Sequence, residues 1–143
     1  MSDEATVYLD TNIFLNVVYK ELPFQASSAA LLRRIQANDL HAITSVVTLA
    51  EVMLVMDASG FGVEAEKALL VIEDIRYLSI VPLDKEVSRE AARYVLKDKI
   101  TIHDAYHLAT ALQSEVQYFV TRDKSLSNKI KKYIGAATPE QVP

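Results

Sequence analysis

Four acidic side chains in this sequence stand where they could act together, although they are far apart along the chain. They are Asp10, Glu51, Asp104 and Asp123. Asp10 directly follows the apolar run Val7–Leu9, and Asp123 lies just beyond the run Val116–Thr121. Runs rich in Val, Tyr, Phe and Leu are typical of buried strands. Because parallel strands end at one edge of a sheet, where α/β proteins bind their ligands, we expect both carboxylates at that edge.

Glu51 and Asp104 can reach the same edge from helices. Glu51 follows a predicted strand at His41–Thr44 by about two helical turns, and Asp104 occupies the first turn of a predicted helix. These acids also have purely structural explanations. Asp10 fits the N-cap of the next helix, and Thr101 with Asp104 fits a capping box. A shared site is therefore a hypothesis that depends on the four acids converging.

Glu51 is the most informative of the four acids, because its neighbours Ala50, Val52 and Met53 are apolar. A helix that packs these neighbours against a sheet would also bury the Glu51 carboxylate, which is costly without a partner. Carboxylates within about 5 Å of each other repel by roughly 3 kcal/mol per pair at an effective dielectric near 20. A shared site therefore requires protons or cations.

The residue types available to this chain narrow the choice of cation. The sequence contains no cysteine, which excludes disulfides and thiolate zinc sites, so oxygen or imidazole groups must hold any metal. Carboxylates favour Mg²⁺ or Mn²⁺, which bind through one or two carboxylates and keep several waters. Beside a phosphodiester, such ions activate water and stabilise the leaving oxygen. The acids thus predict hydrolytic cleavage of a nucleic-acid backbone.

Alternating strands and helices would position these acids. Beyond the three strands already named, we expect one over Tyr77–Pro82, and a small edge strand is a further option over Tyr133–Ala137. Helical patterns cover residues 13–18, 25–38, 45–59, 63–75, 85–97 and 102–114, with a short basic helix through Lys131. This alternation predicts an α/β fold with a mainly parallel sheet of four to five strands and helices on both faces. We expect one domain over residues 1–143, since neither a linker nor a repeat divides the chain.

Basic residues gather in two clusters although the net charge is −4. One cluster is Lys85, Arg89, Arg93 and Lys97, which form a stripe along a helix, and the other is Arg122, Lys124, Lys129, Lys131 and Lys132. Acids lie among both clusters, so a solvated surface is the alternative to a nucleic-acid contact. Arg122 and Lys124 flank Asp123, and we expect them to grip the phosphates of the substrate, with the helical stripe as an extension.

The apolar residues predict a soluble protein with a further contact surface. No apolar run approaches the roughly 18 residues needed to cross a bilayer, and Met1–Glu4 lacks the pattern of a signal peptide, so we expect a cytoplasmic protein without a membrane association. The apolar residues of Val46–Met56 and Val63–Ile75 exceed what one sheet face needs. A part of this surface, including Met53, Met56 and Phe61, could form a two-fold dimer contact or receive a partner helix. Simple core packing is the alternative.

Taken in order, the motifs around the acids resemble the successive signatures of the PIN-domain nucleases. These motifs are Leu9-Asp10-Thr11-Asn12, Thr48-Leu49-Ala50-Glu51-Val52, His103-Asp104-Ala105-Tyr106-His107-Leu108-Ala109-Thr110-Ala111 and Val120-Thr121-Arg122-Asp123. The resemblance spans Val7 to about Pro139 and implies a three-layer α/β/α sandwich with Mg²⁺- or Mn²⁺-dependent endoribonuclease activity. It also implies a metal site made by the four acids. Asn12 and Thr121 match polar positions that accompany the first and last acids, and we expect them to orient waters or carboxylates.

The short, stand-alone length is similar to that of VapC-type toxins from prokaryotic toxin-antitoxin pairs. This resemblance implies three partners, namely an RNA substrate, a cognate antitoxin protein and a second copy of the chain in a homodimer. Arg122 and Lys124 would then bind RNA. The sequence departs from the commonest family pattern at His103, where many relatives carry an apolar or small residue, and this departure leaves local ligation open.

Three other functions remain open on the sequence alone. His103 and His107 are four residues apart on one predicted helix, which resembles a zincin motif with Asp in place of Glu, and His41 would be the third zinc ligand. Asp10 could be a phosphatase nucleophile, although Asn12 occupies the place where that chemistry usually has a second carboxylate. A PIN-like module that binds RNA or protein without cutting is the alternative from another class.

Overall fold

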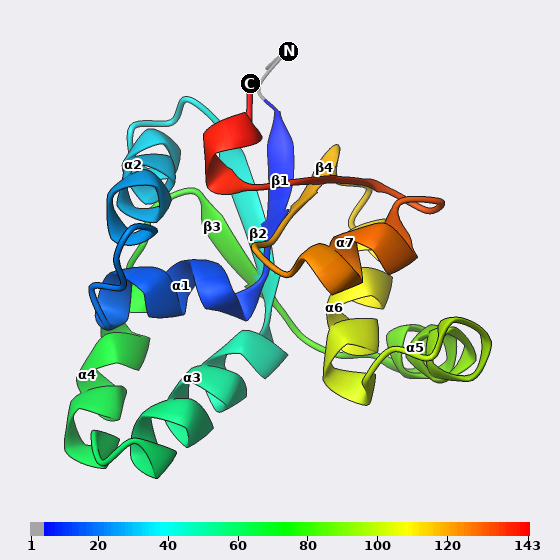
Figure 1. Cartoon of the computed structure of the whole chain (residues 1–143), viewed down its shortest axis with the longest axis horizontal. Helices are drawn as coiled ribbons and strands as arrows, with labels where there is room; N and C mark the ends of the chain where they lie inside the picture. The colour runs from blue at the N-terminus through cyan, green and yellow to red at the C-terminus, as the bar shows by residue number, and fades with distance from the viewer. Residues whose placement is uncertain (1–4) are drawn as a thin grey trace.

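The structure is a computed structural model that describes residues 5–143. The acidic start Met1–Glu4, on which the expectation about a signal peptide rested, lies outside the described residues. Five parallel strands form a single sheet in the centre of the molecule, in the order β3-β2-β1-β4-β5 (Figure 1). The strands are β1 (Thr6–Leu9), β2 (His41–Ser45), β3 (Leu78–Val81), β4 (Tyr118–Val120) and β5 (Gly135–Ala137).

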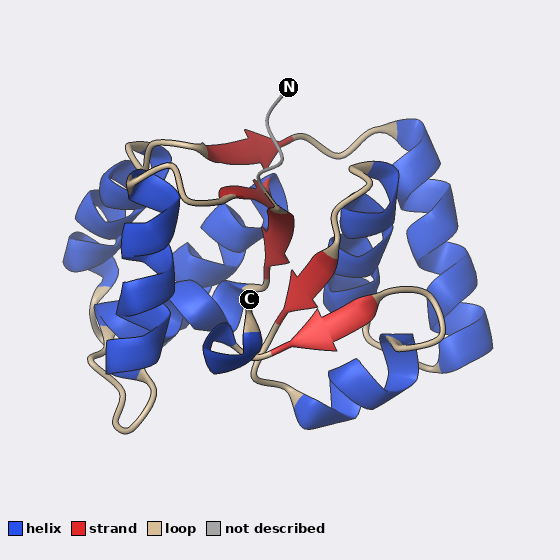
Figure 2. Ribbon diagram, turned by 90° about the horizontal axis from the view of Figure 1, so that it is seen from above, coloured by secondary structure: helices blue, strands red, loops and turns tan. Residues whose placement is uncertain are grey.

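Helices cover both faces of this sheet. They are α1 (Thr11–Val18), α2 (Gln25–Gln36), α3 (Val46–Ala58), α4 (Gly62–Glu73), α5 (Lys85–Asp98), α6 (Ile102–Gln113) and α7 (Lys124–Ile130), and a 3-10 turn η1 (Pro139–Gln141) follows β5. Helices α1 to α4 lie on one side and α5 to α7 on the other, with the sheet between them (Figures 1 and 2). The expected three-layer α/β/α sandwich is therefore confirmed.

The alternation of side chains along β1 explains why both faces are covered. Val7 and Leu9 are fully buried in the core under α1 to α4, whereas Tyr8 is fully buried in the core under α5 to α7. On the neighbouring strand β4, Val120 and Phe119 divide between the two cores in the same way. A strand that is apolar on both faces cannot leave either face to water. The central position of β1 follows from this composition.

The strands and helices expected from the sequence are present in the predicted order, with small shifts at their ends. The possible edge strand near the C-terminus exists as β5, and the strand before Asp123 is shorter than expected, because only Tyr118–Val120 pairs with its neighbours. Among residues 5–143, none of the helices has the length and apolar composition needed to span a bilayer.

Local hydrogen bonds start four helices at the carboxyl edge of the sheet. Asp10 caps α1, and Ser45, one of the two expected caps, accepts a hydrogen bond from Val47 N at the start of α3. Thr101 accepts from Asp104 N at the start of α6, and Asp123 accepts from Leu126 N at the start of α7. Side-chain oxygens satisfy amides that a helix N-terminus would leave unpaired. These caps point the helix starts, with their acids, toward one edge.

Candidate active site at the carboxyl edge of the sheet

Two of the four acids follow strands at this edge, and the other two lie on helices that begin there. Asp10 follows β1 directly, and its amide donates to Val120 O at 3.0 Å, so the pairing of β1 with β4 continues to the first acid. Asp123 follows β4, Asp104 lies in the first turn of α6, and Glu51 lies near the start of α3. The capping roles and the shared edge are both present, because a residue after a parallel strand is also the residue before the next helix.

Asp10 is the most buried of these acids, with 5% of its surface exposed. Its Oδ1 accepts a hydrogen bond from Thr11 N at 2.8 Å. Its Oδ2 accepts from Asn12 Nδ2 at 3.1 Å and from Thr121 Oγ1 at 2.7 Å. Asn12 also reaches Thr121 Oγ1 at 3.1 Å. The two polar side chains that the sequence singled out beside the acids thus hold one carboxylate in a fixed orientation.

The pKa values of Asp10 and Asp104 are raised above their ordinary range. Burial is the main cause for Asp10, and the nearby charge of His107 and the donated hydrogen bonds act against it. For Asp104 the main cause is again burial, followed by the negative charges of Asp10 and Asp123. Like charges in a partly buried site disfavour ionisation. The charges of Asp10 and Asp123 thus lie close enough to Asp104 to oppose its ionisation.

His107 is a member of this site that the sequence patterns did not assign to it. Its side chain is fully buried, and Nδ1 lies 2.6 Å from the Tyr8 hydroxyl. On the other side of the ring, Nε2 lies 2.6 Å from Glu51 Oε1, 3.2 Å from Thr11 Oγ1 and 3.7 Å from Asp10 Oδ1. The imidazole therefore links a core tyrosine under the sheet to two of the acids.

Glu51 obtains from His107 the partner that a buried carboxylate requires. Burial by itself would raise the pKa of Glu51, but the hydrogen bond and the charge of His107 outweigh burial, and the pKa is lowered. Thr11 Oγ1 also donates to Glu51 Oε1 at 3.1 Å. For His107, burial would lower the pKa, but the contact with Glu51 and the charge of Asp10 raise it. The pair is thus favoured as an imidazolium and a carboxylate.

A sequence signal for His107 existed, although it was attached to a different chemistry. His107 lies three residues after Asp104 on α6, a spacing that places two side chains on one face of a helix. The zincin interpretation paired it with His103, which is exposed, and with His41. His41 begins β2 at the opposite edge of the sheet, where its Nε2 contacts Asn38. The three histidines are therefore not a common ligand set.

The donor chemistry of the edge fits a divalent ion with oxygen ligands. No preformed group of three or more potential ligands from His, Asp or Glu occurs within residues 5–143. Mg²⁺ and similar ions do not need such a cage, since they bind through one or two carboxylates and retain waters. Burial, followed by the negative charges of Asp10 and Asp123, raises the pKa of Asp104 at the same place. Asp10, Asp104 and Asp123 are the residues that fit this role.

Arg122, which we expected to grip phosphates, has its guanidinium surrounded by partners from the chain. Nε donates to Asn16 Oδ1 at 2.6 Å, and NH2 donates to the hydroxyls of Ser27 and Ser28, each at 2.9 Å. NH2 also lies 2.9 Å from Glu140 Oε1 in an ion pair. A phosphate would have to compete with these contacts. Lys124, in contrast, is exposed at the first position of α7.

Comparison with known proteins places the chain in a family. Residues 7–132 match the family model described as the PIN domain, and the chain therefore belongs to the PIN domain family. A search of curated protein sequences found no match.

Several solved structures share the fold over nearly their whole length. A chain of VapBC2 from Rickettsia felis, bound to a promoter DNA fragment, is 18% identical with a TM-score of 0.70, covering 93% of this chain and 98% of that one. VapC20 from Mycobacterium tuberculosis, described as a toxin that cleaves the sarcin-ricin loop, is 14% identical with a TM-score of 0.70, covering 85% and 93%. A toxin-antitoxin complex from Klebsiella pneumoniae is 18% identical with a TM-score of 0.65, covering 95% and 99%.

Proposed function

We propose that this PIN domain protein is a Mg²⁺- or Mn²⁺-dependent endoribonuclease that hydrolyses phosphodiester bonds of RNA. The observation that carries this proposal is the coupling of Asp10, Asp104 and Asp123 at one sheet edge, where the pKa of Asp104 is raised by burial and by the other two charges. Such a cluster is costly in free energy unless a cation offsets it. The chain offers only oxygen and imidazole groups to that cation.

In this proposal the acids bind the ion and the surrounding residues orient the acids. Asp10, Asp104 and Asp123 would hold the ion, directly or through waters, and Glu51 would complete the negative charge around it. When bound, the ion would activate a water for attack on phosphorus and stabilise the leaving oxygen. Asn12 and Thr121 fix both the position and the rotamer of Asp10 through their bonds to Oδ2. Supporting contacts of this kind tune ligands without touching the substrate.

His107 has a positioning role in the same scheme. Its Nε2 holds Glu51 Oε1 at 2.6 Å, and the Tyr8 hydroxyl at Nδ1 fixes the plane of the ring. Tyr8 itself stacks on Phe119, with ring centroids 5.2 Å apart. The orientation of Glu51 therefore depends on the core beneath the sheet. A buried network whose members are all satisfied is rigid, which suits a site that must hold several carboxylates together.

The first test is cleavage of a labelled structured RNA by the purified protein, with Mg²⁺ or Mn²⁺ and with EDTA. We expect metal-dependent cutting that falls by at least about 100-fold in Asp10→Asn, because this variant removes a ligand charge. Asp39→Asn is the matched control, since Asp39 is an exposed carboxylate in the turn before β2. Retained RNA binding without cutting under any condition would favour a non-catalytic binding module. Cleavage that EDTA does not affect would contradict metal dependence.

Two further variants in the same assay test the positioning of Glu51. Glu51→Gln and His107→Gln should both lower cleavage, and Glu51→Gln should also lower metal affinity. If the two side chains act as one unit, the double variant should cut no more slowly than the slower single variant. Near-normal activity of Glu51→Gln would remove Glu51 from the site.

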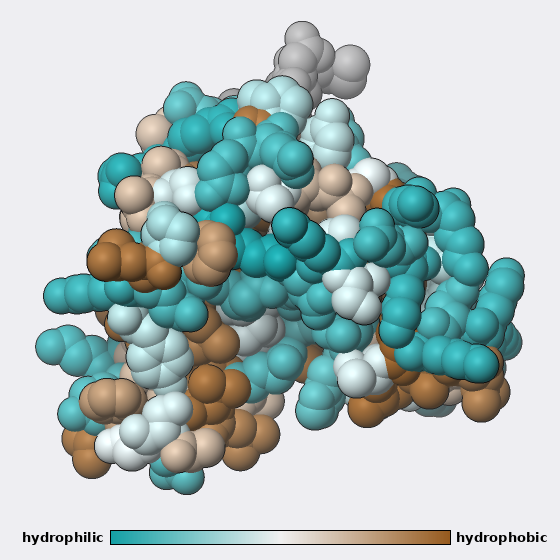
Figure 3. Space-filling view, in the orientation of Figure 1, coloured by the Kyte–Doolittle hydropathy of each residue, from teal (hydrophilic) through white to brown (hydrophobic). Residues whose placement is uncertain are grey.

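We also propose that the protein is the toxin of a cytoplasmic toxin-antitoxin pair and that it forms a homodimer. The resemblance to VapBC structures supports an antitoxin partner. An apolar groove of about 530 Å³ lies between α1, α2, α3 and α4, and apolar side chains gather over α3 and α4 in Figure 3. Phe61 is 46% exposed there, whereas Met56 is 3% exposed and belongs to the core. Light scattering tests the dimer, which a monomer at micromolar concentration would contradict.

A further inference from the structure

Five exposed lysines form a continuous basic surface at the end of the molecule remote from the apolar groove. We call this surface the lysine patch. It consists of Lys97, Lys99, Lys129, Lys131 and Lys132, which come from the C-terminal ends of α5 and α7 and the turns that follow. With Asp98 and Asn128 these side chains surround a cavity of about 320 Å³. Two elements that are far apart in the sequence therefore combine to make one cationic surface.

The charge of the lysine patch is opposite to that of the remaining chain. The whole sequence has 15 basic and 19 acidic residues, for a net charge of −4. Five lysines and Asp98 give the patch a net charge of +4, so the other residues sum to −8. The carboxylate of Asp98 already has two partners within the chain. Lys132 Nζ lies 2.5 Å from Oδ1, and the Tyr133 hydroxyl donates to Oδ2 at 2.7 Å. One carboxylate thus balances only part of the lysine charge.

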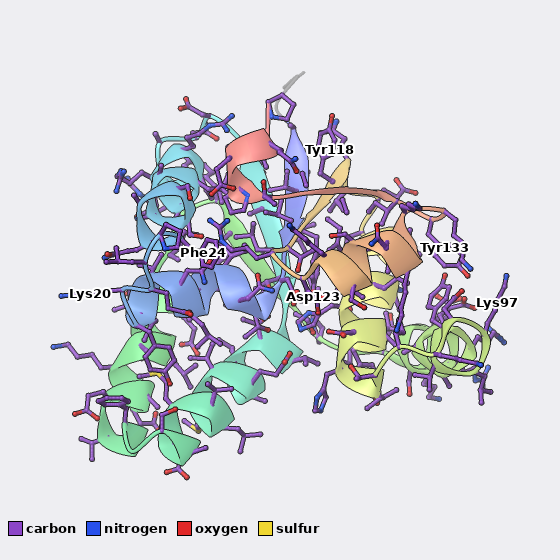
Figure 4. All side chains as sticks on the ribbon, viewed as in Figure 1. Lys20, Phe24, Lys97, Tyr118, Asp123 and Tyr133 are labelled. Atoms are coloured by element: carbon purple, nitrogen blue, oxygen red, sulfur yellow. The ribbon has the colours of Figure 1, made fainter. Side chains whose placement is uncertain are left out.

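Helix α7 connects the lysine patch directly to the candidate active site. Asp123 caps the N-terminus of α7, and Lys129 lies in its last turn. Seven residues of α-helix span only about 10 Å. Figure 4 shows Asp123 near the centre of the molecule, with Tyr133 and Lys97 on the side toward which α7 runs. A chain molecule bound at the acids and continuing along α7 would therefore meet the patch.

The patch is suited to phosphates and not to bases. Its aromatic ring, Tyr133, packs edge-on against Tyr94 at 4.9 Å between centroids, and its hydroxyl is occupied by Asp98. Lys97 and Lys132 lie over the same ring, with Nζ 5.9 Å and 5.4 Å from its centroid. A base that stacked on this ring would have to compete with both ammonium groups. Lysine ammonium groups act as point charges that contact the nucleic-acid backbone without reading its sequence.

We propose that the lysine patch binds the phosphates of the RNA strand that flanks the cleaved bond. This inference rests on the proposed nuclease function, since it assigns a path to the substrate of that same site. The lysine patch would be a second contact region beyond the acids, with a task of its own. The acids position the reacting phosphate, and the patch holds the continuing strand in a way that depends on salt and not on base identity.

The test compares two triple variants that each remove three exposed positive charges. Lys99→Gln, Lys129→Gln and Lys131→Gln weaken the patch and leave the contacts of Lys97 and Lys132 with Tyr133 in place. The matched control changes Lys20, Lys67 and Arg33 to Gln, because the two lysines line the apolar groove and Arg33 is an exposed residue of α2 outside both basic clusters. Each triple is combined with Asp10→Asn, and the affinity for a labelled single-stranded RNA of about 20 nucleotides is measured against salt concentration.

We expect the patch triple to bind at least about 10-fold more weakly at low salt. Its slope of log affinity against log salt should fall by about 0.7 for each phosphate that is no longer neutralised, or about 2 in total. The control triple should retain the slope of Asp10→Asn alone. Equal slopes in both triples would overturn the proposal. Displacement of the RNA by an acidic peptide of equal charge, at equal concentration, would also overturn it, because the patch would then be a general anion surface.

A second readout separates failure of this inference from failure of the nuclease proposal. With Asp10 intact, the patch triple should cut an RNA of two nucleotides at the wild-type rate, since at about 3.4 Å per nucleotide this RNA is shorter than the roughly 10 Å length of α7 and does not reach the patch. It should cut the longer RNA at least about 10-fold more slowly at low substrate concentration. Equal cutting of the long RNA by the wild type and the patch triple would overturn the proposed role of the lysine patch but not the nuclease proposal. A wild-type protein that cuts neither RNA, yet binds through the patch, would overturn only the nuclease proposal.

Discussion

Arg122 and Asp123 are adjacent in the sequence, yet they belong to two regions with opposite electrostatic character. Arg122 points into a cluster made by Asn16, Ser27, Ser28 and Glu140, which we call the arginine clasp. Asp123 points to the candidate active site, where its charge raises the pKa of a neighbouring acid. The charges of the arginine clasp are paired within the chain, and those of the candidate active site are not fully paired.

In the arginine clasp, each charge has a partner of opposite sign. The hydrogen bond from Arg122 holds the pKa of Glu140 at about 2, well below its ordinary value of 4.5. The guanidinium also packs over the ring of Phe24, at 4.5 Å from the centroid. These contacts join the turn after β5 to the segment between α1 and α2. The charges of this region are thus paired within the chain.

At the candidate active site, negative charges remain unbalanced. Burial and the charges of Asp10 and Asp123 raise the pKa of Asp104, and His107 compensates Glu51 more closely than it compensates the others. Stability alone would select against such an arrangement, because neutral residues would pack there at lower cost. The difference between the regions is what the proposed metal dependence predicts, since a cation from outside the chain would offset the charge of the acids. The two regions should therefore respond in opposite ways to the removal of a charge.

The largest expected effect is the loss of the arginine clasp. Arg122→Ala should lower the free energy of unfolding by about 3 kcal/mol, because it leaves Asn16, Ser28 and Glu140 without their shared donor in a partly buried cluster. Arg122→Lys should recover only part of this stability, since an ammonium cannot reproduce the planar guanidinium fork. Urea unfolding of both variants measures the difference.

The neighbouring exposed residue provides the control for this experiment. Lys124→Ala should change the free energy of unfolding by no more than about 0.5 kcal/mol. If Arg122→Ala were as mild as Lys124→Ala, the clasp would have no structural role. Arg122 would then be available for the phosphate contact that the sequence suggested.

A change of opposite sign is expected at the site. Asp104→Asn should raise the free energy of unfolding in metal-free buffer by on the order of 1 kcal/mol, because it removes repulsion with Asp10 and Asp123. The same change should abolish most cleavage. Mg²⁺ should raise the melting temperature of the wild-type protein more than that of the variant, since a ligand stabilises only the state that binds it.

Asp39→Asn, at the opposite edge of the sheet, is the control and should leave both the stability and the Mg²⁺ response unchanged. Destabilisation by Asp104→Asn, with an undiminished response to Mg²⁺, would mean that the acids are balanced within the chain. The contrast between the two regions would then disappear.

The smallest expected effect is the pH dependence of the arginine clasp. The pKa of Glu140 is lower in the folded protein than in the unfolded chain, so its carboxylate stabilises the fold fully above about pH 4.5. This contribution is lost as pH falls through the folded pKa of about 2. Glu140→Gln should therefore be less stable than wild type at neutral pH, by an amount that solvent screening keeps small. The difference in stability between the wild type and Glu140→Gln should become smaller as pH falls.

Urea midpoints of wild type and Glu140→Gln, measured from neutral pH down to about pH 3, would follow this decrease. Glu66→Gln is the control, since Glu66 is an exposed residue of α4 outside the clasp. A gap that stays constant with pH would show that packing, and not ionisation, carries the contribution of Glu140.

The sequence by itself determined the order of strands and helices and the edge at which the acids gather. Alternation of apolar side chains identifies β1 and β4 as buried strands, and the polar residue after each strand is a local signal. Asp10 and Asp123 follow such strands, and the hydroxyl and amide groups of Thr121 and Asn12 stand beside them in the chain. Short-range patterns report these features because backbone geometry relates neighbouring residues directly.

Only the tertiary structure decided which side chains meet across the fold. His107 contacts Glu51 and Tyr8 from a different helix and strand, and sequence spacing had suggested a metal motif with His103 instead. The partners of Arg122 likewise come from α1, α2 and η1, so contacts within the chain surround the guanidinium of the residue beside Asp123. Such pairings depend on strand order and helix packing, which bring distant segments within hydrogen-bond distance, and no local pattern encodes that distance.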